Sequence, residues 1–153
     1  MSLKIWIDAD ACPKAVKEVV YKTSARLQLP VIMVANSGMG HPLHPLISFV
    51  QVAQGQDVAD SYIADHVETC DLVITADIPL AAIIVEKGAL AINPRGELYT
   101  EDNIRERLSI RDFMKELRDS GVETGGPQSF GPKDKENFTN SLHRILTKMM
   151  AKG

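Results

Sequence analysis

The sequence predicts a single-domain α/β protein in which helices cover both faces of a mainly parallel, five-stranded sheet, giving three layers. Three observations support this prediction. Short apolar runs alternate along the chain with segments of helical spacing. One run, at residues 31–35, is apolar at every position, as expected of a strand buried on both faces. The length of 153 residues and the hydrophobic content of 44% suit one domain with a sizeable core.

The predicted strands are short, apolar or β-branched, and bounded by turn or helix signals. They cover residues 3–7, 31–35, 47–52, 72–74 and 89–92. Residues 37–45, between the second and third strands, include two glycines and two prolines, which favour a loop.

Helices are predicted at residues 13–27, 58–69, 79–88, 100–120 and 134–150. Pro13 and Pro79 stand in the first turn, where a helix accepts proline, and Gly88 ends the third helix. Residues 121–133 contain four glycines and two prolines. We therefore expect a loop there, before a C-terminal helix, within one domain that spans residues 1–153.

The composition narrows the class of protein. The chain has 17 Lys and Arg against 20 Asp and Glu, a formal net charge of −3, which argues against a protein that coats nucleic acid over a wide surface. Cys12 and Cys70 are too few for a disulfide framework. The sequence shows no apolar segment of membrane-spanning length and no signal-peptide core, so we expect a cytoplasmic protein without a membrane partner.

Carboxylates follow three of the predicted strands, at the edge where open α/β sheets place their sites. Asp8 and Asp10 follow the first strand, Asp57 and Asp60 the third, and Asp77 the fourth. Clustered like charges repel unless a cation intervenes, and Mg²⁺ and Mn²⁺ prefer carboxylate oxygens. The spacing therefore predicts a site for Mg²⁺ or Mn²⁺.

Helix capping is the alternative explanation for some of these aspartates. Asp57 precedes the predicted helix at residue 58, Asp77 lies just before Pro79, and Asp10 lies close to Pro13. Aspartate is favoured at such N-terminal positions because its side chain accepts hydrogen bonds from free backbone N–H groups.

Four further residues are candidates for substrate contacts. Asn36 and Ser37 follow the second strand, and Thr75 lies between the fourth strand and Asp77, where it could orient a ligand or simply serve as a β-branched strand residue. Arg111 shares a helical stripe with Arg107 and Arg118, which could contact a phosphate backbone. The other interpretation is a solvated face with ion pairs to neighbouring acids. These acids are Glu106, Asp112 and Glu116.

Several motifs resemble those of the bacterial YaiI/YqxD family. They are DADACP (8–13), VAN (34–36), GQDVAD (55–60), DLVITADIPLA (71–81), KGA (87–89), NPRGELYT (93–100), IRERL with RDFM (104–114) and TGGP (124–127). The resemblance implies a PIN-like fold and a nuclease site that uses Mg²⁺ or Mn²⁺. The family's acid pattern falls on Asp8, Asp60 and Asp77 as metal ligands, with Asp10 and Asp57 as close candidates.

Three functions remain open from the sequence. The first is metal-dependent hydrolysis of phosphodiester bonds, with RNA as the expected substrate, in which Asp10 or Asp57 positions water or acts as base. The second is a phosphatase with Asp8 as nucleophile and Asp10 as acid and base. The third is a non-catalytic, metal-stabilised module that binds RNA or protein. The sequence does not predict the oligomeric state.

Overall fold

The computed structural model describes residues 3–38, 40–55, 57–125 and 129–152. Six strands form one sheet in the order β3-β2-β1-β4-β5-β6. The strands are β1 (Ile5–Asp8), β2 (Val31–Ala35), β3 (Ile47–Gln51), β4 (Leu72–Ile74), β5 (Leu90–Ile92) and β6 (Leu98–Tyr99). The helices are α1 (Lys14–Leu27), α2 (Val58–His66), α3 (Ile78–Glu86), α4 (Glu101–Asp119) and α5 (Pro132–Lys152).

The sheet confirms the predicted α/β class and corrects the strand number from five to six. β1 lies at its centre, between β2 and β4, and all pairings from β3 to β5 are parallel. Only β6 is antiparallel, to β5. With two residues, β6 is too short to show a strand period in the sequence.

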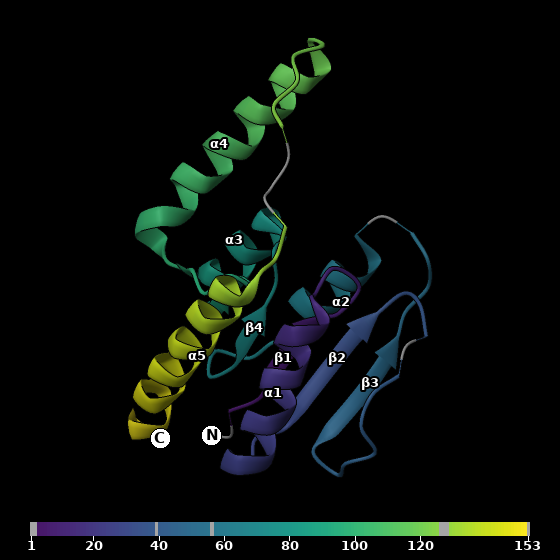
Figure 1. Ribbon diagram of the computed structural model, residues 1–153, viewed down its shortest axis with the longest axis vertical. Helices are drawn as coiled ribbons and strands as arrows, with labels where there is room; N and C mark the ends of the chain where they lie inside the picture. The colour runs from purple at the N-terminus through teal and green to yellow at the C-terminus, as the bar shows by residue number, and fades with distance from the viewer. Residues whose placement is uncertain (1–2, 39, 56, 126–128, 153) are drawn as a thin grey trace.

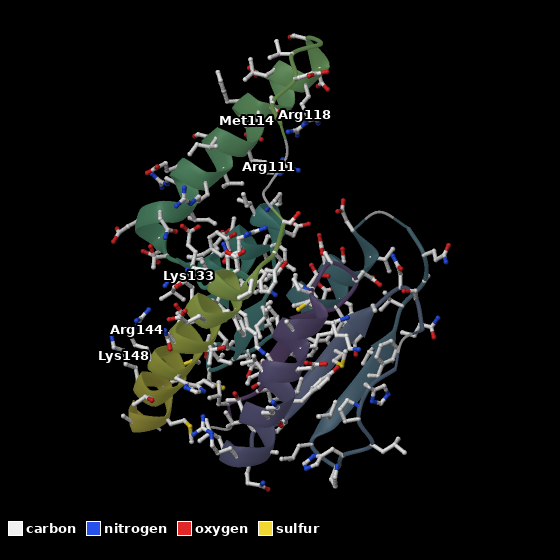
Figure 2. The ribbon with its side chains drawn as sticks, in the orientation of Figure 1. Arg111, Met114, Arg118, Lys133, Arg144 and Lys148 are labelled. Carbon is white, nitrogen blue, oxygen red and sulfur yellow. The ribbon has the colours of Figure 1, made fainter. Side chains whose placement is uncertain are left out.

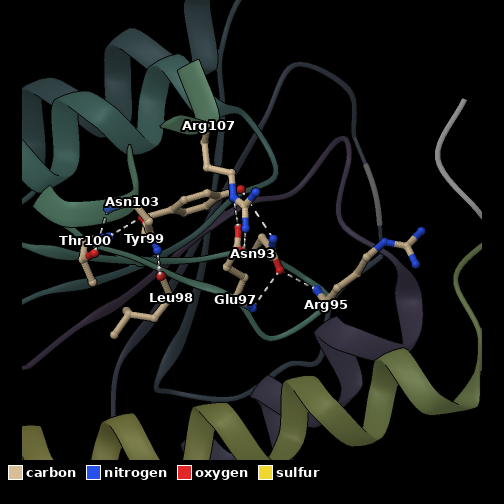
Figure 3. Close-up of polar contacts among 8 residues, drawn as sticks. All are labelled: Asn93, Arg95, Glu97, Leu98, Tyr99, Thr100, Asn103 and Arg107. Carbon is tan, nitrogen blue, oxygen red and sulfur yellow. Dashed lines mark hydrogen bonds and ion pairs between the residues drawn. The ribbon is translucent and has the colours of Figure 1, made fainter. Parts of the chain in front are cut away.

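A tight turn creates the sixth strand (Figure 3). Asn93 Oδ1 accepts hydrogen bonds from the backbone N–H groups of Arg95 and Glu97, at 2.9 and 3.0 Å. Gly96 has a φ of +96°, and a Cβ at this position would come within 2.7 Å of the Asn137 carbonyl oxygen on α5. Only glycine fits both the backbone conformation and this close approach.

The two faces of the sheet bury separate cores, because neighbouring strand residues point to opposite sides. Ile5 and Ile7 of β1 pack with α1 and α5, whereas Trp6 packs with α2 and α3. Figure 1 shows α1 and α5 side by side over one face, with α2 and α3 on the other. Helices therefore cover both faces, as predicted.

Helix α4 packs on α3 only through its first half and then rises away from the sheet (Figure 1). It begins with a capping box between Thr100 and Asn103 (Figure 3). At its other end Gly121, with φ +86°, donates to Arg118 O, and Val122 donates to Leu117 O. This is the pattern of a Schellman motif, which ends the helix at the predicted place.

The C-terminal helix α5 begins at Pro132, so the predicted loop at residues 121–133 is shorter by two residues. Residues 126–128 of that loop lie outside the described residues. Within the part of the chain that the structure describes, no helix is both long and apolar enough to cross a membrane.

Candidate functional site

The predicted site residues meet at the carboxyl edge of the sheet, around its central strand. The chain order runs outward from β1 in both directions, through β2 on one side and β4 on the other, so the strand order reverses at β1 and β4. Open α/β sheets bind ligands at this position. Asp8 is the last residue of β1, and Thr75 follows β4 directly.

Thr75 joins the ends of these two strands. Its hydroxyl donates to Asp8 Oδ2 at 2.9 Å and accepts from the backbone N–H of Asp77 at 3.0 Å. Thr75 is only 1% exposed, so this bridge is shielded from water. Thr75 thus orients one carboxylate directly and positions the backbone of a second.

The pKa of Asp8 is raised above its ordinary value. Burial is the largest cause, and the negative charges of Asp77 and Asp10 add to it. The hydrogen bond from Thr75 acts in the opposite direction, because it stabilises the charged form.

Three carboxylates form what we call the aspartate triad: Asp57, Asp60 and Asp77. One oxygen atom from each lies within 4.8 Å of the other two. Asp57 and Asp60 come from the start of α2, and Asp77 comes from the start of α3. Two helices that pack on the same face of the sheet therefore bring the acids at their N-terminal ends together.

The environment of the triad raises the pKa of the Asp60 carboxyl group. Its pKa is raised to about 7, first by burial and then by a hydrogen bond with Asp77. Repulsion from Asp77, Asp8 and Asp57 raises it further. Close to neutral pH a proton therefore resides on Asp60 for much of the time, and it serves the hydrogen bond to Asp77.

The negative charge of Asp8 helps to raise the pKa of Asp60, but Asp8 is not a member of the triad. The family resemblance implies Asp8, Asp60 and Asp77 as the metal ligands. The structure brings Asp60 and Asp77 together with Asp57, which the resemblance had made a close candidate. Asp8 stands next to this group on the Thr75 side.

Capping explains one aspartate of the three considered. Asp77 is the N-cap of α3, and its Oδ1 accepts from Leu80 N at 3.0 Å. Asp57 holds the N-cap position of α2 with a left-handed φ of +65°, but among the described residues its side chain accepts no capping hydrogen bond. Asp10 lies before α1 and bonds elsewhere.

Asp10 is tied to the loop that follows β2. Its two oxygens accept from Asn36 N at 2.8 Å and from Ser37 Oγ at 3.1 Å. Asp10 and Ser37 are exposed, and Asn36 is half-buried. These three predicted residues form an accessible rim beside Asp8, at the same edge of the sheet.

The arginine stripe lies apart from the aspartates, on α4. Arg111 is exposed and pairs with Asp112 at 3.4 Å, one of the acids expected from the sequence. Arg107 instead makes a bidentate ion pair with Glu97, in which Arg107 Nε lies 2.9 Å from Glu97 Oε1 (Figure 3). Sequence spacing does not reveal this partner, because Glu97 precedes the helix by several residues and lies outside intrahelical spacing.

A fully buried carboxylate, Asp71, lies at the opposite edge of the sheet. It accepts hydrogen bonds from Trp6 Nε1 at 2.9 Å, Glu68 N at 2.9 Å and Lys4 N at 3.2 Å. Its position in the sequence gives no sign of this role, since it follows no predicted strand. With its oxygens satisfied by N–H donors, Asp71 ties β1 to β4 and serves the fold.

Comparison with known proteins identifies the family. A family profile described as "Uncharacterized BCR, YaiI/YqxD family" matches residues 6–148. The chain belongs to the YaiI/YqxD family. The resemblance inferred from the motifs is thereby confirmed over nearly the whole chain.

Relatives within the family come from several bacteria. A UPF0178 protein of Shewanella baltica (strain OS223) is 58% identical over 95% of this chain and 97% of its own length. A UPF0178 protein of Citrifermentans bemidjiense is 56% identical over 97% of this chain and 96% of its own length. A third, from Geobacter sp. (strain M21), is also 56% identical. No solved structure matches the chain.

Proposed function

We propose that the protein is a divalent-metal-dependent nuclease with a PIN-like fold, and that it hydrolyses the phosphodiester bonds of RNA. The aspartate triad carries the proposal. It places three carboxylate oxygens within 4.8 Å of one another, beside Asp8, at the point where an α/β sheet binds its ligands.

The donor set of the triad fits a hard divalent cation. All three side chains offer oxygen, and no histidine or cysteine of the described residues belongs to the group. Mg²⁺ and Mn²⁺ favour such ligands, whereas zinc favours nitrogen and sulfur. Asp57, Asp60 and Asp77 would hold the ion, with the charge of Asp8 close by.

The raised pKa of Asp60 supports this assignment. Carboxylates held this close must either share a proton or receive a cation. Loss of the Asp60 proton turns the triad into an all-anionic site. When bound there, Mg²⁺ or Mn²⁺ would supply positive charge for a phosphate group and acidify water.

The chain's own residues divide the remaining tasks. Thr75 keeps Asp8 oriented toward the triad through its 2.9 Å hydrogen bond. Asp10, fixed by Asn36 and Ser37, is an exposed carboxylate that can accept a proton from attacking water. Asn36 and Ser37 are also placed to orient a substrate phosphate from the rim.

An exposed rim suits a polymer better than an enclosed pocket does, and it supports the assignment to a nucleic-acid backbone. Asp10, Ser37 and Asp57 are all exposed, so a phosphate within a chain can reach the carboxylates. Arg111, also predicted to contact substrate, lies on α4 and carries no step in this proposal.

Calorimetric titration with Mn²⁺ tests the site, followed by assay on a labelled single-stranded RNA. Asp60→Asn should abolish both binding and Mn²⁺-dependent cleavage. Asp65→Asn is the matched control, because it removes the same charge from the exposed side of α2. The control should behave like the wild type.

The other outcomes separate the alternatives. Binding without cleavage would favour the non-catalytic module. Hydrolysis of a phosphomonoester through a phosphorylated Asp8 would favour the phosphatase. Equal Mn²⁺ binding by wild type and Asp60→Asn would refute the metal site.

A further inference from the structure

Helix α4 carries an apolar face whose side chains are exposed in the described part of the chain. We call Ile110, Phe113, Met114 and Leu117 the α4 stripe. Ile110 is 43% exposed, Phe113 52% and Met114 38%. Val122, which the Schellman motif returns toward Leu117, is 48% exposed. Seven large hydrophobic side chains are exposed among the described residues, and four of them are Ile110, Phe113, Met114 and Val122.

The stripe points away from the protein's own core. At about 100° per residue, it occupies an arc of roughly 100° on the helix. Ile104 and Leu108, which pack toward α3, lie on nearly the opposite side. The stripe belongs to the half of α4 that stands clear of the sheet (Figure 1). A second helix can therefore pack there without displacing α3.

The spacing of the stripe is that of a short coiled-coil seam. Ile110 and Leu117 take d positions, Met114 takes the a position between them, and Phe113 is at g. Both e positions next to this seam are arginines, Arg111 and Arg118, which project from the same side of α4 (Figure 2). The preceding g position is Glu106.

We propose that the α4 stripe is a homodimer interface, in which α4 of a second copy packs in parallel along a two-fold axis. In a parallel pair, each g residue meets the e residue five positions later on the partner helix. Glu106 then faces Arg111 of the second copy, and Phe113 faces its Arg118. Both contacts attract, the first as an ion pair and the second as a cation–π contact.

The same charges disfavour the antiparallel alternative. Antiparallel helices place e residues against e residues, so Arg111 would lie beside Arg118 of the second copy. The helix thus carries both halves of a self-complementary parallel interface. An unrelated protein would have to supply matching charges of its own, whereas a second copy already has them.

Dimerisation would also explain how the second half of α4 is stabilised, since it stands clear of the sheet. Helices in proteins gain most of their stability from packing an apolar face. The second half of α4 has such a face, on which Ile110, Phe113 and Met114 remain exposed. The seam is short, so we expect a reversible dimer with a dissociation constant of about 1–100 µM.

Sedimentation equilibrium of the full chain tests the proposal. At about 100 µM, at least about half of the wild-type chains should be in dimers. Met114→Glu should raise the dissociation constant at least about 100-fold, because the a positions of a parallel pair would then bring two carboxylates face to face in the seam. Leu43→Glu is the control, since Leu43 is 99% exposed on a distant loop and should not matter. Circular dichroism checks that each variant folds.

Charge reversal tests the orientation. Glu106→Arg and Arg111→Glu should each weaken the dimer by roughly tenfold, since each creates two like-charged pairs. The double variant should restore wild-type affinity. A monomeric wild type, or a dimer that survives Met114→Glu, would overturn the interface. A dimer that either single reversal leaves unchanged or strengthens would overturn the parallel arrangement.

Discussion

The raised pKa of Asp60 makes the stability of the protein depend on pH in a specific way. A carboxyl group whose folded-state pKa is raised binds its proton more tightly in the folded state than in the unfolded state. Its contribution to stability is therefore full below the unfolded pKa of about 3.8 and is lost as the pH rises through about 7. The fold should weaken between pH 4 and pH 8 on account of this one group.

The size of the effect follows from the shift. A rise from 3.8 to about 7 corresponds to roughly 4 kcal/mol if no screening acts. Asp60 is partly exposed, so solvent screening reduces the expected loss to about 1–2 kcal/mol. For a chain of this length, that is a decrease in Tm of roughly 3–6 °C.

The Asp60→Asn variant isolates this contribution. Asparagine keeps the shape and can donate a hydrogen bond to Asp77, but it carries no charge at any pH. Without metal at pH 8, we expect the variant to be more stable than the wild type by about 1–2 kcal/mol, with the difference vanishing near pH 5.

Urea unfolding at closely spaced pH values, in a chelating buffer, measures the difference between the two proteins. Subtracting the curves removes the titration of all other groups. Asp65→Asn serves as the control for loss of a surface charge and should follow the wild type. A stability difference that is independent of pH would refute the reasoning.

Four further outcomes are expected. Mn²⁺ binding should release about one proton per site at pH 6 and almost none at pH 8, because Asp60 must lose its proton to become a ligand; calorimetry in buffers of different ionisation enthalpy measures this. Thr75→Val should cost about 1–3 kcal/mol in urea unfolding and raise the pKa of Asp8 further, measured by carboxyl NMR titration, since a stabilising hydrogen bond is lost. Gly96→Ala should cost about 2 kcal/mol or more in thermal unfolding, because α5 and the positive φ both exclude a Cβ. Asp71→Ala should cost about 2–4 kcal/mol in urea unfolding, since one buried and two partly buried N–H donors lose their acceptor.

The sheet could be predicted from sequence wherever its strands are buried on both faces. Strands β1, β2 and β4 carry continuous apolar runs, and the helices between them reveal parallel pairing. The sixth strand escaped prediction because the Asn93 turn, not a hydrophobic period, creates it. Helix α2 ends at His66 instead of residue 69, because Glu68 N turns to donate to the buried Asp71.

The edge that holds the site could be predicted, but the grouping of its residues could not. Parallel strands bring their carboxyl ends together whatever the details of the loops, so Asp8 and Asp77 had to be neighbours. Whether Asp57 or Asp8 completes the tight group depends on how α2 lies on the sheet. That placement is set by packing around residues such as Ile63, which sequence spacing does not resolve.

Asp71 and Asp60 show why the aspartate triad points to a ligand and not to the fold. Both carboxyl groups are removed from full contact with water, but three N–H donors surround Asp71, whereas other carboxylates surround Asp60. The first environment stabilises the folded chain, and the second opposes it at neutral pH. A neutral side chain at Asp60 would relieve the repulsion and still hydrogen-bond to Asp77. The unfavourable carboxylate makes physical sense if a cation takes the place of its proton.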